Sequence, residues 1–563
     1  MKEFKDEIIE VIKKATGLSE VNLEVPPDHT MGDFAFPCFS LARERKKNPK
    51  EIAEDLCKEI PVGGAIRKVE VSGPYVNIFL DYVTIAEEIL KKVRKEAENY
   101  GRVSGSTAKV IVETPSPNTN KPLHLGHLRN ILLGLSISNV LRLTGREVHI
   151  VEAVNDRGVH ICKSMLAYKR WGGGETPESV GKKSDHFVGD YYVMFSREAK
   201  KDPSLEQEAQ DMLLKWEQGD PETVELWKQM NSWVLEGFRQ TYERLGFAVE
   251  KQYFESETYK HGKDIVENNM QVFQKDEDGA LIADLEDKGL GKKVVLRPNG
   301  TSVYITQDLY LAKKRQEDYD FDEMIYVVAN EQKYHFEVLF ELFRRLGFSF
   351  AGKCYHFAYG MVNLPDGKMK SREGTVVDID DILDEVFNLT KSEIEARYAD
   401  LDQVEKDHRA REIANAAVRF FFLKFDPLKD FAYNPKESIS FEGETGPYVQ
   451  YTHARICSIL RKSDGIPVEI NYKVYEEEES RLIIRMIAEF PDIIEESSRK
   501  LNPSLVTRYL LDLSQLCNEY YHKYPVLKAE DVIRDARLML LDRSRQVISN
   551  GLEILGIKAL ERM

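Results

Sequence analysis

The sequence of 563 residues has few cysteines, no long apolar run and no excess of positive charge. Its six cysteines form no C-x-x-C pair and no Cys/His cluster with zinc spacing, which excludes a disulfide scaffold and the usual structural zinc sites. Free thiols suit a reducing compartment, so we expect a cytoplasmic protein. No run of about 18 apolar residues occurs, so we expect no membrane span. The net charge of −16 argues against a generally basic nucleic-acid coat, although a local basic face can still bind a polyanion.

The pattern of apolar residues changes twice along the chain, which predicts three domains. Residues 1–105 combine helices with two short strands and indicate a small α+β domain. Residues 106–384 begin as strand, loop, helix and strand, which is typical of a Rossmann-like, doubly wound parallel sheet. A polar helical stretch from about 165 to 260 reads as an insertion in that domain. Residues 385–563 are helical almost throughout and predict an all-α bundle.

Two histidines open the first helix of the α/β domain, in the stretch SPNTNKPLHLGHLRN (116–130). The first backbone amides of a helix are unpaired and favour anions, so a phosphate is the natural ligand. Gly126 leaves room for a base or ribose, while His124 and His127 add donors. Two satisfied structural histidines would be the simpler interpretation. The preceding strand and the Asn/Pro-rich loop favour a nucleotide site.

A second motif, KMKSR (368–372), follows a turn-rich basic loop about 240 residues downstream. HLGH resembles the first signature of the class I aminoacyl-tRNA synthetases, usually written HIGH. KMKSR resembles their second signature, usually written KMSKS. Each motif has limited specificity, but both occur here in the family's order and on suitable loops.

Further blocks narrow the resemblance to the arginyl-tRNA synthetases. VETPSPNTNKPLHLGHLRN, VNDRG, GTSVYITQDL and YVVANEQKYH resemble catalytic blocks of that family. SFEGETGPYVQYTHARI and the terminal helix resemble its helical anticodon-binding domain, and GDFAFPCFSLAR with GPYVNIFL resembles its tRNA-contacting N-terminal domain. The resemblance covers essentially the whole chain.

The resemblance implies an enzyme of protein biosynthesis, an arginine–tRNA ligase. Such an enzyme uses ATP, as its Mg²⁺ complex, to convert L-arginine to arginyl-adenylate. It then transfers the arginyl group to the 3′-terminal adenosine of tRNA(Arg), and activation in this family commonly requires bound tRNA. We expect a monomer, no membrane partner and no structural metal held by the protein.

The catalytic residues implied by the two signatures are His124, His127 and Lys368. The ATP-binding set is His124, Gly126, His127, Met369, Lys370 and Ser371. The chain departs from KMSKS, because Ser371 stands where a second lysine is usual. Members of the family that lack this lysine often carry one just before HIGH, where Lys121 lies here. We therefore predict that Lys121 supplies the second catalytic cation, with Lys370 as the alternative donor.

The resemblance also implies five arginine-binding residues. Glu113, Tyr304 and Asp308 would face the guanidinium, which needs planar or anionic acceptors. Asn118 and Gln332 would hold the α-amino and carboxylate groups. Lysine cannot reproduce the guanidinium fork, so discrimination needs no editing domain.

The residues predicted to contact tRNA lie at both ends of the chain. Aromatic and arginine side chains of a helical bundle can stack on unpaired anticodon bases and meet phosphates. An amphipathic helix with core aromatics is the alternative interpretation for each. The candidates are Asn77, Phe79, Tyr448, Tyr451, Arg455, Arg537 and Arg545.

Three other functions remain open at this stage. A small-molecule nucleotidyltransferase would share the H-x-G-H loop but would not need the long helical bundle. A catalytically inactive, synthetase-like tRNA-binding protein would not need intact His124, His127 and Lys368. Another class I synthetase is the nearest rival, and the carboxylates Glu113 and Asp308 are the residues that distinguish it.

Overall fold

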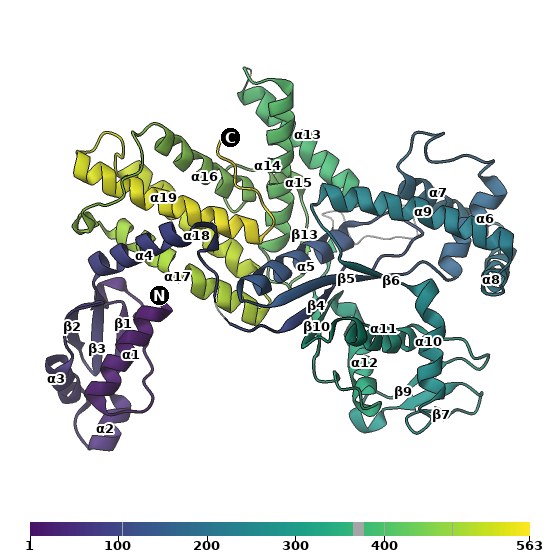
Figure 1. The fold of residues 1–563 in the computed structure, drawn as a ribbon, viewed down its shortest axis with the longest axis horizontal. Coiled ribbons are helices and arrows are strands. Elements are labelled where there is room, and N and C mark those ends of the chain that lie inside the picture. Colours follow the sequence, from purple (N-terminus) through teal and green to yellow (C-terminus); the bar gives the residue numbers. More distant parts are fainter. Residues whose placement is uncertain (104, 364–376, 399, 476) are drawn as a thin grey trace.

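The computed structural model describes residues 1–103, 105–363, 377–398, 400–475 and 477–563. A small N-terminal region, a central sheet with helices on both faces, and a C-terminal group of helices follow one another along the chain (Figure 1). None of the helices in those ranges combines the length and apolar character needed to cross a membrane.

The N-terminal region is a three-stranded antiparallel sheet in the order β1-β3-β2, packed against helices. The two short strands predicted within residues 1–105 form the hairpin of β2 and β3, which turns at Gly73 and Pro74. The elements are α1 (Lys2–Thr16), β1 (Phe34–Pro37), α2 (Phe39–Arg45), α3 (Pro49–Glu59), β2 (Ile66–Ser72), β3 (Tyr75–Leu80) and α4 (Tyr82–Glu96).

The central sheet has five parallel strands in the order β11-β10-β4-β5-β6. The first strand in the sequence, β4, lies in the middle of the sheet, with β5 and then β6 on one side of it. The later strands β10 and β11 lie on the other side of β4. Loops at the carboxyl ends of β4 and β10 therefore diverge, and such a switch point is where doubly wound folds bind ligands. The strands are β4 (Lys109–Glu113), β5 (Glu147–Val154), β6 (Lys251–Phe254), β10 (Glu323–Ala329) and β11 (Cys354–Tyr359).

Successive side chains of each strand point to opposite faces of this sheet. Val110 and Val112 of β4 join the core that contains α5 (Leu125–Leu143). Ile111 between them joins the core of the opposite face, which contains α11 (Tyr304–Tyr319) and α12 (Lys333–Arg345). Burial on both faces explains why the three residues after Lys109 are a continuous apolar run, VIV.

The stretch between β5 and β6 is helical, as predicted, with all four tryptophans on its helices. The predicted range 165–260 also contains β6, an edge strand of the central sheet, so the inserted helices end at Arg244. The sequence did not reveal a three-stranded antiparallel sheet before α11. The elements are α6 (Val159–Trp171), α7 (Ser184–Ala199), α8 (Ser204–Glu217), α9 (Pro221–Arg244), α10 (Glu255–Glu267), β7 (Gln274–Lys275), β8 (Leu281–Asp284) and β9 (Lys292–Leu296).

The C-terminal part is helical, as expected, except for the short strand β13, which pairs with β12. Its helices share one continuous core with α5 and with α4 of the N-terminal region. The elements are β12 (Val362–Asn363), α13 (Ile379–Arg397), α14 (Gln403–Leu423), β13 (Phe431–Ala432), α15 (Pro435–Ser438), α16 (Gly446–Arg461), α17 (Glu478–Lys500), α18 (Ser504–Lys523) and α19 (Asp531–Ile554).

Candidate functional site

The loops at the carboxyl edge of the parallel sheet hold most of the predicted site. Glu113 ends β4, and the loop to α5 carries Asn118 and His124. Gln332 follows β10, and Glu255 follows β6 directly. Residues far apart in the sequence thus meet at one edge, because every strand of the sheet points the same way.

The two signature histidines lie stacked at the start of α5. Their ring centroids are 3.9 Å apart and the rings are inclined by 24°. His124 is the N-cap residue, and its Nδ1 accepts a hydrogen bond from the Gly126 amide at 3.1 Å. The Nδ1 of His127 accepts from the His124 amide at 3.1 Å. Each ring therefore carries its proton on Nε2 when neutral, and both Nε2–H groups remain donors.

Burial keeps both histidines neutral at physiological pH. Burial, together with the charge of Lys121, lowers the pKa of His124 to about 4. Burial lowers the pKa of His127 well below its usual value. The expectation of open backbone amides here is wrong in part. The Gly126 amide is used by His124, and the Leu125 amide donates to Val377 O at 3.2 Å. Binding of an anion then depends more on the imidazole donors than on the first amides.

Backbone pairing fixes the signature loop against the start of α13. His124 forms an antiparallel bridge with Asp378, and the Ile379 amide donates to Leu123 O at 2.9 Å. The second signature precedes this segment by only a few residues. The residues Lys368, Met369, Lys370 and Ser371 themselves lie outside the described part of the chain.

Lys121 lies against helix α7 of the inserted helices. A Cβ on Gly189 would come within 2.7 Å of Pro122 Cδ, so the glycine permits this close approach. Lys121 is half-buried, and burial lowers its pKa. Its ammonium also lowers the pKa of both His124 and His127, which follow it by three and six residues in the same loop and helix start. The proposed second cation is thus near the signature.

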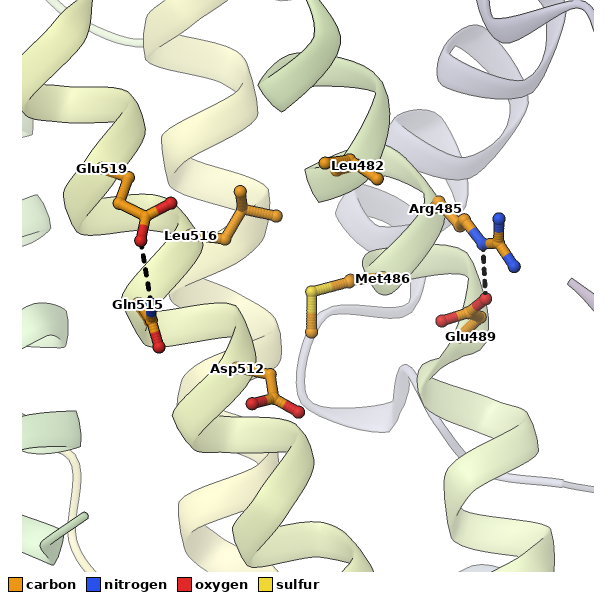
Figure 2. A pocket seen from close by; sticks show the side chains of 8 residues that line it. All are labelled: Leu482, Arg485, Met486, Glu489, Asp512, Gln515, Leu516 and Glu519. Atoms are coloured by element: carbon orange, nitrogen blue, oxygen red, sulfur yellow. Dashed lines mark hydrogen bonds and ion pairs between the residues drawn. The ribbon is translucent and has the colours of Figure 1, made fainter. Parts of the chain in front are cut away.

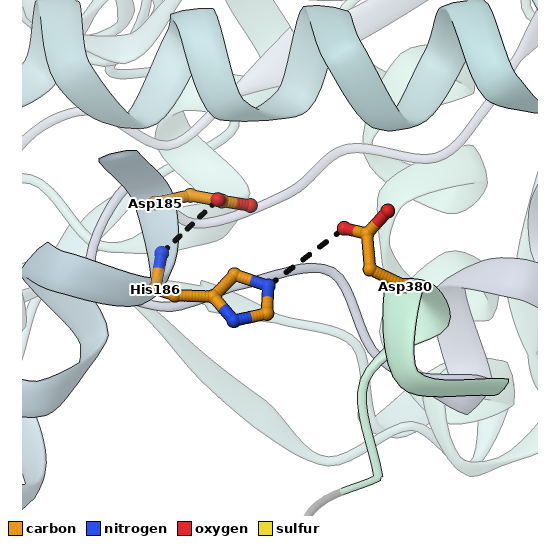
Figure 3. Close-up of side chains that lie close together, drawn as sticks. All are labelled: Asp185, His186 and Asp380. Carbon is orange, nitrogen blue, oxygen red and sulfur yellow. Dashed lines mark hydrogen bonds and ion pairs between the residues drawn. The ribbon is translucent and has the colours of Figure 1, made fainter. Parts of the chain in front are cut away.

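A buried ionic cluster joins the inserted helices to the first turn of α13 (Figure 3). Asp185, His186 and Asp380 are the one group of His, Cys, Asp and Glu side chains in the described ranges with spacing suited to a metal. Lys183 Nζ lies 3.0 Å from Asp185 Oδ2 and 2.8 Å from Asp380 Oδ2. Arg244 Nη1 also lies 2.7 Å from Asp380 Oδ1, so two cations pair with these two carboxylates and the cluster forms a set of ion pairs.

Arg129 and Asn130 of the first signature block are structural. The Arg129 guanidinium donates to four carbonyl oxygens, at distances from 2.6 to 3.3 Å, two directly before β12 and two in the segment before β13. Asn130 Nδ2 donates to Val327 O at 2.6 Å and to Tyr359 Oη at 3.0 Å. These two side chains fix α5 on the sheet and do not reach a ligand site.

A cavity of about 1080 Å³ opens at the same edge of the sheet. Asn118 and Tyr304, two of the predicted arginine-binding residues, line it together with Gln307 and Glu255. The inserted helix α8, helix α10 and the turn before α11 form the other walls. Its volume matches the upper range of small-molecule sites.

Glu255 is a buried carboxylate of this cavity that sequence reasoning missed. Its Oε1 accepts from Gln307 Nε2 at 2.8 Å and lies 3.5 Å from Arg157 Nη1. Burial raises the pKa of Glu255 to about 7, against the effect of Arg157. An acidic residue directly after a strand of a parallel sheet was the available signal, but β6 is too short to be recognised in the sequence.

The other three predicted arginine-binding residues do not line the cavity. Glu113 is paired with the buried guanidinium of Arg315 and accepts from Ser116 Oγ at 3.0 Å. Asp308 Oδ2 lies 2.7 Å from His335 Nε2. Gln332 is exposed after β10.

The predicted tRNA contacts divide into two groups. Tyr448, Tyr451 and Arg455 gather around Asn518, whose Nδ2 donates to Tyr448 Oη at 3.1 Å and whose Oδ1 accepts from Arg455 Nη1 at 3.1 Å. Arg455 also stacks on Tyr451 at 4.7 Å. This group is half-buried on α16 and α18 and leaves aromatic surface for bases.

The remaining four contact other residues of the protein, and two of them, Asn77 and Arg537, are buried. Arg537 is buried, donates to Pro525 O at 2.7 Å and pairs with Glu477 at 2.9 Å. Arg545 pairs with Asp542 at 3.0 Å. Asn77 is buried on β3, and Phe79 is half-buried, with Lys68 Nζ 4.7 Å from its ring centroid.

A second hollow, of about 440 Å³, lies between α17 and α18 (Figure 2). Its lining combines acidic with apolar side chains and includes no residue of the predicted site. It lies on the helical bundle, away from the carboxyl edge of the sheet. The cavity beside Glu255 is therefore the candidate substrate site.

Comparison with known families matches the chain in three pieces. The model "tRNA synthetases class I (R), catalytic domain" matches residues 89–434. The "DALR anticodon binding domain" matches residues 449–563, and the "Arginyl tRNA synthetase N terminal domain" matches residues 2–80.

Curated relatives and solved structures agree with these matches. The arginine–tRNA ligase of Treponema denticola is 45% identical over 97% of this chain and 95% of that protein. The arginine–tRNA ligase of Parabacteroides distasonis is 40% identical over 97% of this chain and 96% of that protein. The structure of Thermus thermophilus arginyl-tRNA synthetase superposes with a TM-score of 0.82 at 27% identity and covers 99% of this chain and all of that one.

Proposed function

The chain belongs to the arginyl-tRNA synthetase family and is an arginine–tRNA ligase, and we propose that its arginine site is the cavity beside Glu255. The observation that carries this proposal is the position of Glu255. A buried carboxylate with a raised pKa lies in a cavity at the carboxyl edge of the sheet. A guanidinium is its natural partner, because a planar fork of donors matches a carboxylate and replaces the hydration that burial removed.

The guanidinium end is assigned to Glu255, Tyr304 and Asp308. Tyr304 and Asp308 are four residues apart in the first turns of α11, so they share one helix face. The contacts with Gln307 and Arg157 both fall on Glu255 Oε1, which leaves Oε2 to accept from the substrate.

The α-amino and carboxylate end is assigned to Asn118, Gln332 and Glu113. Asn118 lies in the loop between β4 and the histidine signature, so it connects the cavity to the nucleotide end of the site. Arg315 holds the Glu113 carboxylate at the end of β4. We therefore assign Glu113 to the substrate ammonium rather than to its guanidinium.

ATP is assigned to the stacked histidines. The Nε2–H groups of His124 and His127 donate to its phosphates, while Gly126 leaves space beside the ring pair. Lys121 and, in the second signature, Lys368 neutralise charge on the phosphates, with Met369, Lys370 and Ser371 completing the ATP site. Mg²⁺ arrives with ATP as part of the substrate complex.

The first step needs alignment rather than a general base. An oxygen of the arginine carboxylate, already ionised, attacks the α-phosphorus and displaces pyrophosphate. The charge that builds on the phosphate oxygens is stabilised by neutral imidazole donors and lysine ammonium groups. In the second step a ribose hydroxyl of the terminal tRNA adenosine attacks the arginyl carbonyl, and AMP leaves.

The tRNA is assigned to both ends of the molecule. Tyr448, Tyr451 and Arg455 form the best-supported anticodon surface, since they offer aromatic faces beside a guanidinium. Arg537 and Arg545 support the bundle around that surface, and Asn77 with Phe79 would approach the tRNA from the N-terminal region. The predicted domain division was 1–105, 106–384 and 385–563; residue 385 lies inside α13 (Ile379–Arg397), so we propose the start of that helix as the last boundary. We also propose a cytoplasmic monomer.

Pyrophosphate exchange tests the assignment. With tRNA present, each amino acid is offered in turn with ATP and labelled pyrophosphate, and only arginine is expected to support exchange. Glu255→Gln should raise the KM for arginine at least about 10-fold, because a neutral amide cannot form the charge-assisted fork. An unchanged KM in this variant would move the arginine site away from Glu255.

A further inference from the structure

Arg157 is a guanidinium that the protein itself places inside the substrate cavity. It follows β5, in the block VNDRG, and its side chain is only 10% exposed. Arg157 lines the cavity together with Glu255 and Glu217. Neither the two signatures nor the proposed arginine contacts account for it.

Its contacts join two elements that are distant in the sequence. Nη2 forms a close ion pair with Glu217 at the end of α8, and Nη1 lies 3.5 Å from Glu255 Oε1 at the start of α10. The guanidinium lies over the Tyr259 ring at 4.0 Å, with the Trp216 ring at 5.7 Å. Two carboxylates and two aromatic faces thus hold it where the substrate guanidinium would enter.

The charge of Arg157 matters because of what else faces Glu255. The negative charges of Asp156, on the same loop, and of Asp308 in α11 raise the pKa of Glu255. Gln307 donates a hydrogen bond to Glu255, which lowers this pKa. Tyr304 of α11 and Lys260 and Lys263 of α10 line the same cavity. Arg157 is the cation in direct contact with the carboxylate among these groups, so it favours the ionised form of Glu255 and opposes the effect of burial.

We propose that Arg157 is a positioning residue that holds Glu255 for the substrate guanidinium. Through its ion pair with Glu217, Arg157 also transmits the binding of arginine to α8. Bound arginine shares the Glu255 carboxylate with Arg157, and two guanidinium groups at one carboxylate repel each other. Arg157 then shifts its pairing toward Glu217 and changes its position over Trp216. This inference rests on the proposed role of Glu255.

The first test is the Arg157→Met variant, which keeps length and removes charge. At about pH 7 we expect its KM for arginine to rise about 10-fold, with a smaller change in kcat, because Arg157 does not touch the reacting atoms. The difference should shrink at about pH 9, where Glu255 ionises without help. A loss of equal size at both pH values, or no loss, would overturn the inference.

The second test is tryptophan fluorescence during titration with arginine. We expect arginine binding to change the tryptophan fluorescence of the wild type. The Trp216→Phe substitution should abolish this change. Arg157→Lys keeps the charge and should retain most of the affinity, but it cannot span both carboxylates and should lose the fluorescence change. Glu217→Gln should lose the fluorescence change as well. This variant replaces Arg157→Met as the test if Arg157→Met does not fold. A wild-type response retained in both variants would refute the link to α8.

Glu255→Gln separates the two proposals. If that variant binds arginine normally, the arginine site itself is misplaced. If it loses affinity while Arg157→Met does not, only the role of Arg157 fails.

Discussion

The protonation of single side chains controls the chemistry at this site. Both signature histidines accept backbone hydrogen bonds at Nδ1, and burial lowers the pKa of His124 to about 4. They therefore act as neutral donors at physiological pH, and positive charge must come from lysine. Lys121 is half-buried close to this pair, which supports its role as the second catalytic cation.

Replacing Lys121 by alanine should slow adenylate formation by about 100-fold, the loss expected when one group that stabilises transition-state charge is removed. The KM for arginine should change little, because the cavity beside Glu255 is intact. Exchange of labelled pyrophosphate at saturating ATP measures this, with Lys182→Ala on the exposed surface as control. An exchange rate equal to that of the wild type would assign the cation to Lys370 instead.

The affinity for arginine should fall as the pH falls through about 7. Burial raises the pKa of Glu255 to about 7, so its carboxylate is protonated below that value and fully ionised above it. A protonated Glu255 forms no charge-assisted fork, so KM rises on the acidic side. Measuring the KM for arginine from about pH 6 to about pH 9 tests whether KM rises on the acidic side. A flat profile would contradict it.

At the scale of elements, the inserted helices do more than fill the space between β5 and β6. Gly189 lets α7 pack directly on the loop of Lys121, and Lys183 pairs with Asp380 at the start of α13. The first turn of α13 in turn pairs with the signature loop at His124. Three segments of the chain therefore support one another beside the histidine pair, and Figure 3 shows the part of this contact made by Asp185 and His186 with Asp380.

Lys183→Met should destabilise the protein by about 3 kcal/mol, since it leaves the buried Asp185 without its cation beside Asp380, which keeps its pair with Arg244. Burial raises the pKa of Asp380, but the hydrogen bonds that it accepts from His186 and Lys183 lower it below its usual value, so Asp380 is ionised at neutral pH. Loss of the lysine charge therefore destabilises the protein at neutral pH. The melting temperature reports the loss. Lys182→Met removes only an exposed pair and is the matched control.

A second change identifies the cause. Adding Asp185→Asn to Lys183→Met removes one of the facing charges and should restore part of the stability. If the double variant is less stable than Lys183→Met, the loss is one of packing and not of charge.

At the scale of the whole molecule, one core runs from the N-terminal region through α5 into the helical bundle. Asn550 of α19 donates to Ala97 O and Tyr100 O, both at 2.9 Å. Tyr100 Oη donates to Ile487 O at 2.8 Å on α17. These bonds fix the N-terminal region relative to the proposed anticodon surface, so both can meet one tRNA in a set geometry.

Asn550→Leu should weaken tRNA binding without changing arginine activation. The variant loses both donors to the segment 97–100, which leaves two carbonyls without them. We expect the KM for tRNA to rise several-fold and exchange at saturating tRNA to stay close to wild type. Gln240→Leu, which removes only an exposed bond within α9, is the control. An unchanged KM for tRNA would show that this junction does not set the geometry.

The sequence by itself determined the class of fold, the family and the nucleotide signature. KVIV reads as a strand buried on both faces, and HLGH falls where that strand meets a helix, so both are local patterns. The helices of the C-terminal part follow from apolar spacing in the same way. The comparisons confirmed the resemblance to arginyl-tRNA synthetases over the whole chain.

Only the tertiary structure decided which charged groups meet. Glu255 follows a strand of four residues, and its partners Gln307 and Arg157 lie 52 and 98 residues away, so no local pattern joins them. Glu113 was expected to face the substrate guanidinium, but packing of α11 places Arg315 against it first. Pairing depends on distance in space and on burial, which parallel strands impose by bringing remote loops to one edge.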